Sequence, residues 1–462
     1  MISEPEQLLP GTRRALLHRI AVAQSEGRAP SLVAAVQRQG QVVWSGSRSC
    51  VDGHAPDGDT QFRIGSLTKT FTAVLVLRLR DEGLLNLDDP LEKHLPGTGV
   101  GDTTVHQLLG HSAGLAAESP GPWWERTPGA LRPELPDVLG EQTRMHVPGH
   151  RFHYSNPGYT LLGSLVEKVR GTSWEQALRD EILEPLGMHR TSLQPESPHA
   201  GGWAVHPWAD VMLPEPAEDL GLMAPAGQLW STTSDLLRFA AFLTEGDDRV
   251  LCADSVEEMR KPSAPAGPGD WQSSYGLGLQ LARDGDRTLF GHTGSLPGFL
   301  ATLWISAEDD VAAVALTNTT AGLAIGEVAA ELVGIVAEAE PRIPEPWRPL
   351  TESEVDTDLL ALTGPWYWGT RANVLRLIPG GGLEIAPMRG AGRGARFVPG
   401  DDGTWTGLDG YYAGEILRVV RNDDGSVNHL DLGSFVFTRE PYDPAAAVPG
   451  GVDASGWRGL GD

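Results

Sequence analysis

The sequence predicts an α/β domain with a helical insertion, followed by a small antiparallel β-barrel. The first observation is a helix–hairpin start, about residues 1–85, and a strand–helix end, about 260–345, which together could form one sheet domain. The second is the stretch between them, about 86–259, which has many helix patterns and few convincing strands. The third is a change in composition near residue 346, after which short alternating strands predict the barrel.

Three patterns predict the first part of the α/β domain. Residues 12–26 carry apolar side chains on one stripe, which predicts an amphipathic helix. Residues 31–36 and 41–44 are apolar strands separated by a glycine turn, which predicts a hairpin. Residues 71–79 are apolar nearly all round, so we expect a helix that is buried in the core.

The insertion and the segment after it contain further helix and strand patterns. Residues 158–167 and 235–243 are amphipathic, and the second stretch follows a capping cluster of Ser, Thr and Asp at 231–235. Strands are then expected at 275–281, 289–291, 299–305 and 311–317, and an apolar helix at 321–336 should lie across their sheet.

The carboxy-terminal part is predicted to be a separate β domain, residues 359–462, after a linker at 346–358. Four prolines and several acids at 338–349 are typical of a linker. The glycines at 390, 392 and 394 lack the strand–turn–helix setting of a phosphate loop and predict a hairpin. Strands separated by Gly and Asp turns are expected at 366–368, 374–378, 383–386, 396–398, 416–420 and 435–438.

Composition excludes several classes of function. A chain of 462 residues is long enough for two or three domains, and its formal charge of −25 argues against nucleic acid and anionic membranes as partners. The two cysteines have no CxxC or Cys/His ligand spacing, so neither a metal site nor a cofactor is expected. The first residues are acidic, and neither a signal-peptide core nor a membrane span follows, which predicts a cytoplasmic protein.

Ser66 and Lys69 lie at the start of the predicted buried helix. Residues three apart on a helix are neighbours, so a hydroxyl and an amine can share a proton there. The free N–H groups of the helix start can also bind an oxyanion. One Ser-x-x-Lys is expected by chance in a chain of this length, so the pair needs support from other motifs.

Two further motifs supply chemistry that suits this pair. Tyr154 and Asn156 lie in a loop before a helix, where a phenol can relay a proton and an amide can hold a carbonyl or orient Lys69. The run His292-Thr293-Gly294-Ser295 follows a predicted strand, where an imidazole and hydroxyl can meet a substrate that approaches the glycine closely. Each motif alone is ordinary, but their order and context make coincidence improbable.

Two other patterns are interpreted as structural. Gly110-His111-Ser112-Ala113-Gly114 fits G-x-S-x-G, but the residues before it, 103–109, have a helical pattern where a nucleophile elbow needs a strand. Ser112 is therefore expected to be structural. A group of histidines does not have the spacing of a metal site and is predicted to lie on the surface or in loops: His106, His111, His146, His150 and His153.

These motifs together resemble the active-site-serine penicillin-recognising family, which includes class C β-lactamases, DD-peptidases, related esterases and D-aminopeptidases. The resemblance runs from about residue 10 to 340, and most β-lactamases have Lys where this chain has His292. The resemblance implies a β-lactamase/DD-peptidase-like sheet domain. Its carriers are FRIGSLTK at 62–69, LDDP at 87–90, LLGHSAGL at 108–115, YSNPGY at 154–159, EPLGM at 184–188 and GHTG at 291–294.

The resemblance also implies a role for each site residue. Ser66 is the expected nucleophile, Lys69 its base, and Tyr154 the proton relay to the leaving group. Asn156 and His292 are expected to position the acyl donor, with Thr293 and Gly294 also on the substrate side. The backbone N–H groups of Ser66 and Ser295 resemble an oxyanion hole. Lys69 must be neutral for this chemistry, and burial would lower its pKa.

The predicted function is acyl transfer through a Ser66 acyl-enzyme. The carboxy-terminal domain resembles the lipocalin-like domain of penicillin-binding-protein-type thioesterases, which release and cyclise nonribosomal peptides. We therefore expect a peptidyl thioester as donor and a carrier protein of a peptide synthetase as partner. The alternatives are a hydrolase of the same family, acting as an esterase, D-aminopeptidase or D-peptidase, and a sensor in which Ser66 is acylated without turnover.

Overall fold

The computed structural model describes residues 8–53, 55–263, 272–320, 322–344, 346–353, 355–400, 402–443, 445–447 and 451. The chain divides between Ile343 and Pro344 into two compact units, which are called the sheet unit and the barrel unit below. Within the described residues, no helix is both long enough and apolar enough to cross a bilayer.

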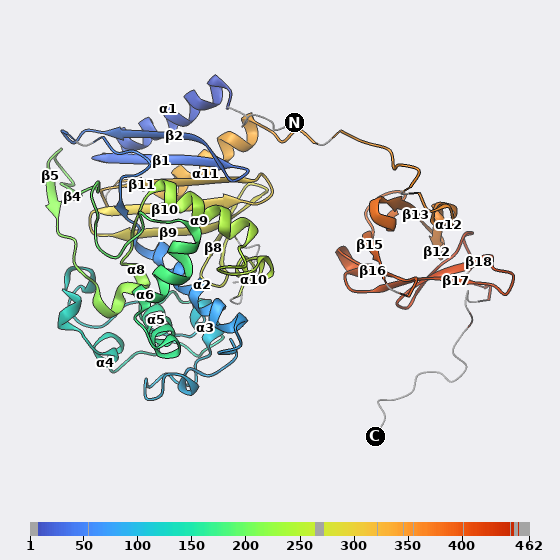
Figure 1. Cartoon of the computed structure of the whole chain (residues 1–462), viewed down its shortest axis with the longest axis horizontal. Helices are drawn as coiled ribbons and strands as arrows, with labels where there is room; N and C mark the ends of the chain where they lie inside the picture. The colour runs from blue at the N-terminus through green and yellow to red at the C-terminus, as the bar shows by residue number, and fades with distance from the viewer. Residues whose placement is uncertain are drawn as a thin grey trace. The chain divides into compact units, whose positions relative to one another are not determined.

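A seven-stranded sheet forms the centre of the sheet unit, with the order β2-β1-β11-β10-β9-β8-β7 (Figure 1). Its pairs are antiparallel, and β1 pairs with β11 in the register Leu32 to Thr317, so both ends of the segment build one sheet as predicted. The strands are β1 (Ser31–Arg38), β2 (Gln41–Ser49), β7 (Ser273–Tyr275), β8 (Gln280–Asp284), β9 (Arg287–Leu296), β10 (Phe299–Ser306) and β11 (Val311–Thr317).

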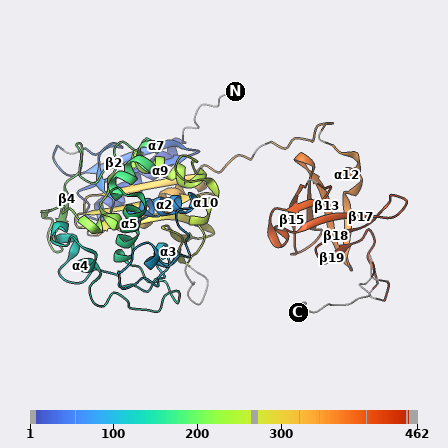
Figure 2. The ribbon, with the colours of Figure 1, turned by 60° about the horizontal axis from the view of Figure 1, so that its bottom comes forward.

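Helices cover both faces of this sheet. Figure 1 shows α1 (Pro10–Glu26) and α11 (Ile325–Ala339) on one side of the strands. In Figure 2 the other face comes forward, and α2 (Thr68–Asp81), α5 (Asn156–Arg170) and α9 (Thr233–Glu245) lie in front of the sheet. The central strands β1, β10 and β11 are buried on both faces and therefore contribute alternate residues to two apolar clusters.

The region inserted between the two parts of the sheet is mainly helical, as expected. Its other helices are short: α3 (Val105–Leu109), α4 (Leu135–Leu139), α6 (Trp174–Leu178), a π-helical turn (Arg179–Leu183), α7 (Glu184–Leu186), α8 (Ala224–Gly227) and α10 (Ala253–Met259). Single 3₁₀ turns occur at Leu91–Lys93, Trp124–Arg126, Gly129–Leu131 and Gly221–Met223. The region also contains strands that the sequence pattern did not show: β4 (Gly202–Val205) pairs with β5 (Met212–Glu215), and β6 (Trp230–Ser231) pairs with β3 (Phe62–Arg63), which precedes the region.

Two predicted strands differ from the observed ones near the candidate site. The expected strand at 275–281 is two strands, because Gly278 adopts φ +79°, which breaks the extended chain between β7 and β8. The expected strand at 289–291 is the middle of β9, which continues to Leu296. The motif at His292 therefore lies within a strand and does not follow one.

The barrel unit is an eight-stranded antiparallel sheet in which each strand pairs with the next, from β12 to β19. A bridge between Tyr367 and Thr438 joins its two ends, so the sheet is nearly closed, in agreement with the predicted barrel. A helix, α12 (Thr357–Leu362), precedes it. The strands are β12 (Gly364–Trp368), β13 (Arg371–Ile378), β14 (Gly382–Pro387), β15 (Ala395–Pro399), β16 (Trp405–Gly407), β17 (Ile416–Arg421), β18 (Val427–Leu432) and β19 (Phe435–Phe437), with 3₁₀ turns at Pro379–Gly381 and Gly410–Tyr412.

Helix α5 packs so closely on α8 that one of its residues must be glycine. A Cβ on Gly163 would lie 2.1 Å from Cγ of Pro225, whereas a Cβ on Gly334 in α11 would have no atom closer than 3.7 Å. Alanine normally favours a helix over glycine by about 0.5–1 kcal/mol, but overpacking costs about 1–3 kcal/mol. We expect Gly163→Ala to lower the thermal unfolding midpoint and Gly334→Ala to raise it slightly. A stable Gly163→Ala protein would show that α5 can move away from α8.

Candidate active site

Ser66 lies where a short strand turns into the buried helix α2. Strand β3 ends at Arg63, and the 3₁₀ turn Gly65–Leu67 leads directly into α2. Gly65 adopts φ +51°, a conformation that glycine tolerates best. Helix α2 is buried nearly all round, as its sequence predicted; its buried residues are Thr68 to Leu77 and Leu79. The turn is therefore fixed between a sheet pair and a core helix.

Lys69 is fully buried and its amino group has three neighbours with fixed positions. Nζ donates to Ser66 Oγ at 3.0 Å, to Asn156 Oδ1 at 2.7 Å and to the Ala226 carbonyl at 2.7 Å. The amide and carbonyl oxygens can only accept, so they hold two N–H bonds of the amine. The third direction points at the Ser66 hydroxyl, and in the neutral amine this direction is the lone pair.

Burial lowers the pKa of Lys69 to about 7, while the carboxylates of Glu118 and Glu125 act in the opposite direction. Burial removes the water that hydrates the charged ammonium group, so the neutral amine becomes more favourable. Lys69 can thus accept a proton near neutral pH.

The Tyr154–Asn156 segment lies at the start of α5, as expected. Ser155 is the N-cap of this helix: its Oγ accepts from the Gly158 N–H at 3.1 Å and donates to the Ala116 carbonyl at 2.7 Å. The ring of Tyr154 lies with its centroid 4.9 Å from Lys69 Nζ. Burial raises the pKa of Tyr154 well above its ordinary value, although a hydrogen bond with Ser66 lowers it. The phenol therefore stays protonated.

Glu118 is a site residue that sequence reasoning missed. Its carboxylate accepts from Asn156 Nδ2 at 2.9 Å and from Trp124 Nε1 at 2.7 Å. The amide of Asn156 thus joins the carboxylate on one side to the Lys69 amine on the other. No sequence signal identifies this carboxylate, because it lies in an irregular loop 38 residues from Asn156.

The edge of β9 carries the second half of the site. The Thr293 N–H donates to Gln280 Oε1 at 3.0 Å, and the Thr293 hydroxyl donates to the same atom at 3.1 Å. Strand β8 begins at Gln280 and pairs no further along β9 than Gly291. Because successive N–H groups alternate between edges, the Ser295 N–H faces the same outer edge as that of Thr293.

Two glycines let this edge meet the Ser66 turn. A Cβ on Gly65 would lie 2.7 Å from the Ser295 nitrogen, and a Cβ on Gly294 would lie 3.0 Å from the Ser66 nitrogen and 1.9 Å from the Ile64 oxygen. The backbone nitrogens of Ser66 and Ser295 are thus brought together at one place. This arrangement can bind an oxyanion.

His292 is buried, and both of its ring nitrogens have partners. Nδ1 lies 2.5 Å from the Thr293 carbonyl, which can only accept, so the proton is on Nδ1. Nε2 must then accept from the Tyr275 hydroxyl at 3.0 Å. Burial lowers the pKa of His292 to about 3, and Lys69 adds to this shift, so the ring is neutral. Tyr275 was not foreseen, because it pairs with His292 only through the fold.

His111 lies in a loop, as expected, but it is buried and does not lie on the surface. Its side chain is 1% exposed and packs against Tyr154, Tyr159 and Tyr275, with ring centroids 4.1, 5.1 and 4.6 Å away. The loop after α3 turns inward here, because His111 adopts φ +55°. Nearby Ser112 is buried and follows α3, not the strand that a nucleophile elbow requires. The described residues include no group of three His, Cys, Asp or Glu side chains that could hold a metal.

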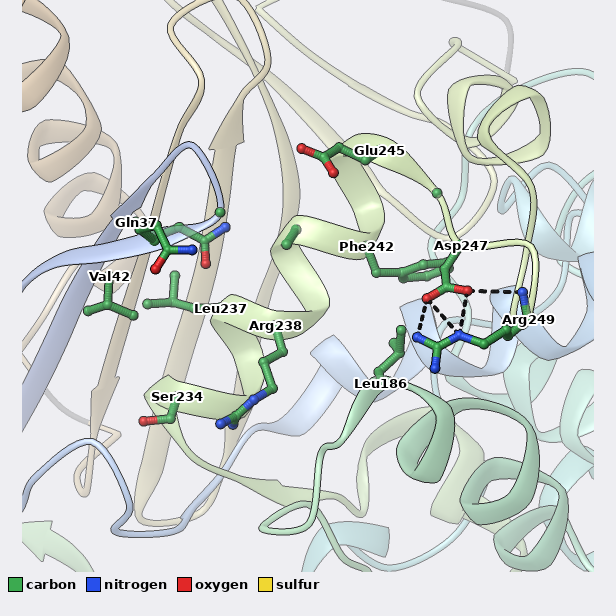
Figure 3. A pocket seen from close by; sticks show the side chains of 14 residues that line it. Gln37, Val42, Leu186, Ser234, Leu237, Arg238, Phe242, Glu245, Asp247 and Arg249 are labelled. Carbon is green, nitrogen blue, oxygen red and sulfur yellow. Dashed lines mark hydrogen bonds and ion pairs between the residues drawn. The ribbon is translucent and has the colours of Figure 1, made fainter. Parts of the chain in front are cut away.

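A cavity of about 610 Å³ elsewhere in the sheet unit does not include the site residues. It lies between the β1–β2 turn and α9, with Gln37 and Val42 on one side and Arg238 and Phe242 on the other (Figure 3). At one end of this cavity Asp247 and Arg249 form an ion pair with each other, at 2.6 Å (Figure 3).

Comparisons with known proteins identify the sheet unit. The family model described as Beta-lactamase matches residues 16–338, and a domain of unknown function, DUF7586, matches residues 355–439. Penicillin-binding protein 4 of Amycolatopsis lactamdurans is 30% identical over 336 residues, covering 68% of this chain and 86% of that protein. Several other curated relatives are covered over 52%, 56% or 53% of their length, so the chain spans about half of them.

Solved structures agree with the family match. A D-stereospecific amidohydrolase from Streptomyces sp. is 26% identical, with a TM-score of 0.59, and the match covers 72% of this chain and 98% of that chain. A structure described as SurE with D-Leu is 26% identical, with a TM-score of 0.55, covering 94% of this chain and 100% of that chain. The chain therefore belongs to the β-lactamase and penicillin-binding-protein-like family of serine hydrolases.

Proposed function

We propose that the protein hydrolyses D-configured aminoacyl or peptidyl donors through an acyl-enzyme on Ser66. The observation that carries this proposal is the position of the Lys69 amine, 3.0 Å from Ser66 Oγ, with its other two N–H bonds held by Asn156 and Ala226. A base that is already aimed at the nucleophile needs no rearrangement to act. A pKa of about 7 also places this base near the pH at which general bases are most effective.

Acylation follows from these contacts. Neutral Lys69 takes the Ser66 hydroxyl proton as Oγ attacks the donor carbonyl. The negative charge that develops on the carbonyl oxygen lies against the N–H groups of Ser66 and Ser295. The Tyr154 phenol gives its proton to the leaving group as the carbonyl–leaving-group bond breaks, and it regains a proton from the Lys69 ammonium. The acyl-enzyme then reacts with an acceptor by the same transfers in reverse.

The charges around the site favour a donor with an ammonium group. The charged groups that act on Lys69 are the carboxylates of Glu118 and Glu125, whereas His292 is neutral. A donor carboxylate would be repelled by these acids, and an ammonium would be attracted. A free D-amino acid amide or a peptide with a free amino terminus has such a group.

The comparisons support D-configured donors. The amidohydrolase from Streptomyces sp. is described as D-stereospecific, a protein from Ochrobactrum anthropi is described as a D-amino acid amidase and has been solved with D-phenylalanine and with L-phenylalanine, and SurE was solved with D-Leu. These relatives share the fold that positions Ser66.

A second candidate function is release and cyclisation of a peptidyl thioester presented by a carrier protein. What favours it is the barrel unit, a nearly closed eight-stranded antiparallel sheet that resembles the lipocalin-like domain of peptide-cyclising thioesterases. In that reaction the peptide's own amine replaces water as the acceptor. The carboxylates of Glu118 and Glu125 near Lys69 would then attract the amino group of the peptide that attacks the acyl-enzyme.

The first prediction about function concerns Ser66. D-Phenylalanine amide should be hydrolysed by the wild type, and Ser66→Ala should lower kcat at least about a thousand-fold because the nucleophile is absent. The matched control is Ser112→Ala, which should retain activity because Ser112 lies outside the site. Ammonia release measures both. L-Phenylalanine amide and N-acetyl-D-phenylalanine amide should each be at least about tenfold poorer, and equal rates for all three amides would contradict the substrate class.

The second prediction concerns pH. With p-nitrophenyl acetate, which carries no ionisable group, neutral Lys69 is the active form, so kcat/KM should rise as pH rises through about 7 and then level off. Glu118→Gln removes the carboxylate that raises the pKa of Lys69 most, so this rise should move to lower pH. Glu141→Gln, a change at an exposed acid that does not act on Lys69, should leave the profile in place. A profile that is flat from pH 5 to 9 would contradict Lys69 as the base.

The third prediction separates the two candidate functions. A peptidyl N-acetylcysteamine thioester that ends in a D-residue is offered to the wild type and to Ser66→Ala, and the products are weighed by mass spectrometry. Linear acid from the wild type alone supports the hydrolase. A cyclic product that is lost in the variant would replace that conclusion with the cyclase.

A further inference from the structure

We propose that His111 is a positioning residue, which holds Tyr154 and Asn156 in place for acyl transfer at Ser66. The inference deepens the proposed function and rests on it, because Tyr154 and Asn156 act only if Ser66 is the nucleophile. The geometry of His111 itself does not depend on which donor is used.

His111 binds the residue that lies between these two side chains. The Ser155 N–H donates to Nδ1 of His111 at 3.1 Å. The Ser155 hydroxyl is occupied with the Gly158 N–H and the Ala116 carbonyl. The Asn156 N–H also donates to the Ala117 carbonyl at 2.9 Å, so the backbone between Tyr154 and Asn156 is held at several points, and the imidazole supplies the attachment at the Ser155 N–H.

The ring of His111 also supports the Tyr154 phenol. The two ring centroids are 4.1 Å apart with an interplanar angle of 33°, and Tyr275 lies 4.6 Å away on another side. Tyr275 in turn donates to His292. His111 thus contacts both Tyr154 and Tyr275, and Tyr275 binds His292 on the other side of the site.

This position is costly, which favours a role beyond filling space. His111 adopts φ +55°, which is uncommon for a residue other than glycine although His, Asn and Asp adopt it more often than most, and its Nε2 is buried without a hydrogen-bond partner among the described residues. Strained and unsatisfied groups of this kind cluster at functional sites. A smaller residue such as glycine would fit the backbone with less strain, but it could not accept from Ser155 or support Tyr154.

Only the neutral imidazole with its proton on Nε2 can fill this role, because Nδ1 must accept. A proton on Nδ1 would face the Ser155 N–H and break the hydrogen bond. Burial lowers the pKa of His111 well below its ordinary value, and Lys69, His292 and His153 act in the same direction. The other titratable groups that face the ring are the phenols of Tyr154, Tyr159 and Tyr275, which are neutral near pH 7.

Two variants separate the hydrogen bond from the bulk of the ring. His111→Asn keeps a side-chain acceptor and tolerates the positive φ, whereas His111→Phe keeps a ring but leaves the Ser155 N–H without an acceptor. With p-nitrophenyl acetate as the acylating probe, His111→Phe should lower kcat at least about tenfold with little change in KM. His111→Asn keeps the acceptor but loses the support of the ring, so its kcat should fall clearly less than that of His111→Phe.

The pH profile shows whether the effect passes through the site. If Asn156 moves in His111→Phe, the Lys69 ammonium loses an acceptor, and the acid side of the profile should shift to lower pH. It should not shift in His111→Asn. Equal losses in both variants, or an unshifted profile in His111→Phe, would overturn the proposal.

A measurement on the wild type decides the matter even if His111→Phe does not fold. ¹⁵N-histidine NMR should show His111 as the neutral Nε2–H form from pH 6 to 8. A protonated Nδ1 at pH 7 would overturn the proposal. Failure of the wild type to react with p-nitrophenyl acetate would instead count against Ser66 acylation, which separates the two failures.

Discussion

The burial of one amine is the constraint on which the rest of the site depends. Lys69 can act as a base only if its ammonium is made unfavourable, and removal from water does this. The same burial requires acceptors for the two N–H bonds of the neutral amine, which Asn156 and the Ala226 carbonyl supply. Helix α2 is buried nearly all round, and its Lys69 amine is turned toward Ser66.

The second requirement is that distant parts of the chain meet without side chains between them. The N–H of Ser295 is free of the sheet because β8 begins beside Gly291 and leaves the end of β9 without a neighbouring strand on that edge. The Ser66 turn occupies this space, and Gly65 and Gly294 permit the contact. The pairing of β1 with β11 stabilises this contact, because the pairing joins the two parts of the sheet.

Periodicity predicted the parts of this structure that depend on local pattern. The buried helix at Ser66, the helix after Tyr154 and the sheet built from both ends follow from apolar spacing and caps. The break at Gly278 did not, because a positive φ leaves no trace in an apolar strand pattern. Strand β16 is only three residues long, and β18 carries Asn428 and Asp431, which obscure its pattern. Glu118, Tyr275 and His111 were missed because their roles come from tertiary contacts between segments that have no motif in common.

The neutral state of His292 links the strength of the base to the charge of the donor. A cation at this position would repel the Lys69 ammonium and lower its pKa further, and it would also attract a donor carboxylate. Because the imidazole of His292 is neutral, burial alone lowers the pKa of Lys69, while the carboxylates of Glu118 and Glu125 raise it. The two carboxylates are tolerated because the pKa of the amine, although they raise it, is still only about 7 and not higher, so Lys69 remains a competent base. The same charges that weaken the burial effect favour an ammonium-bearing donor, and a change at His292 should therefore alter substrate choice and pH dependence together.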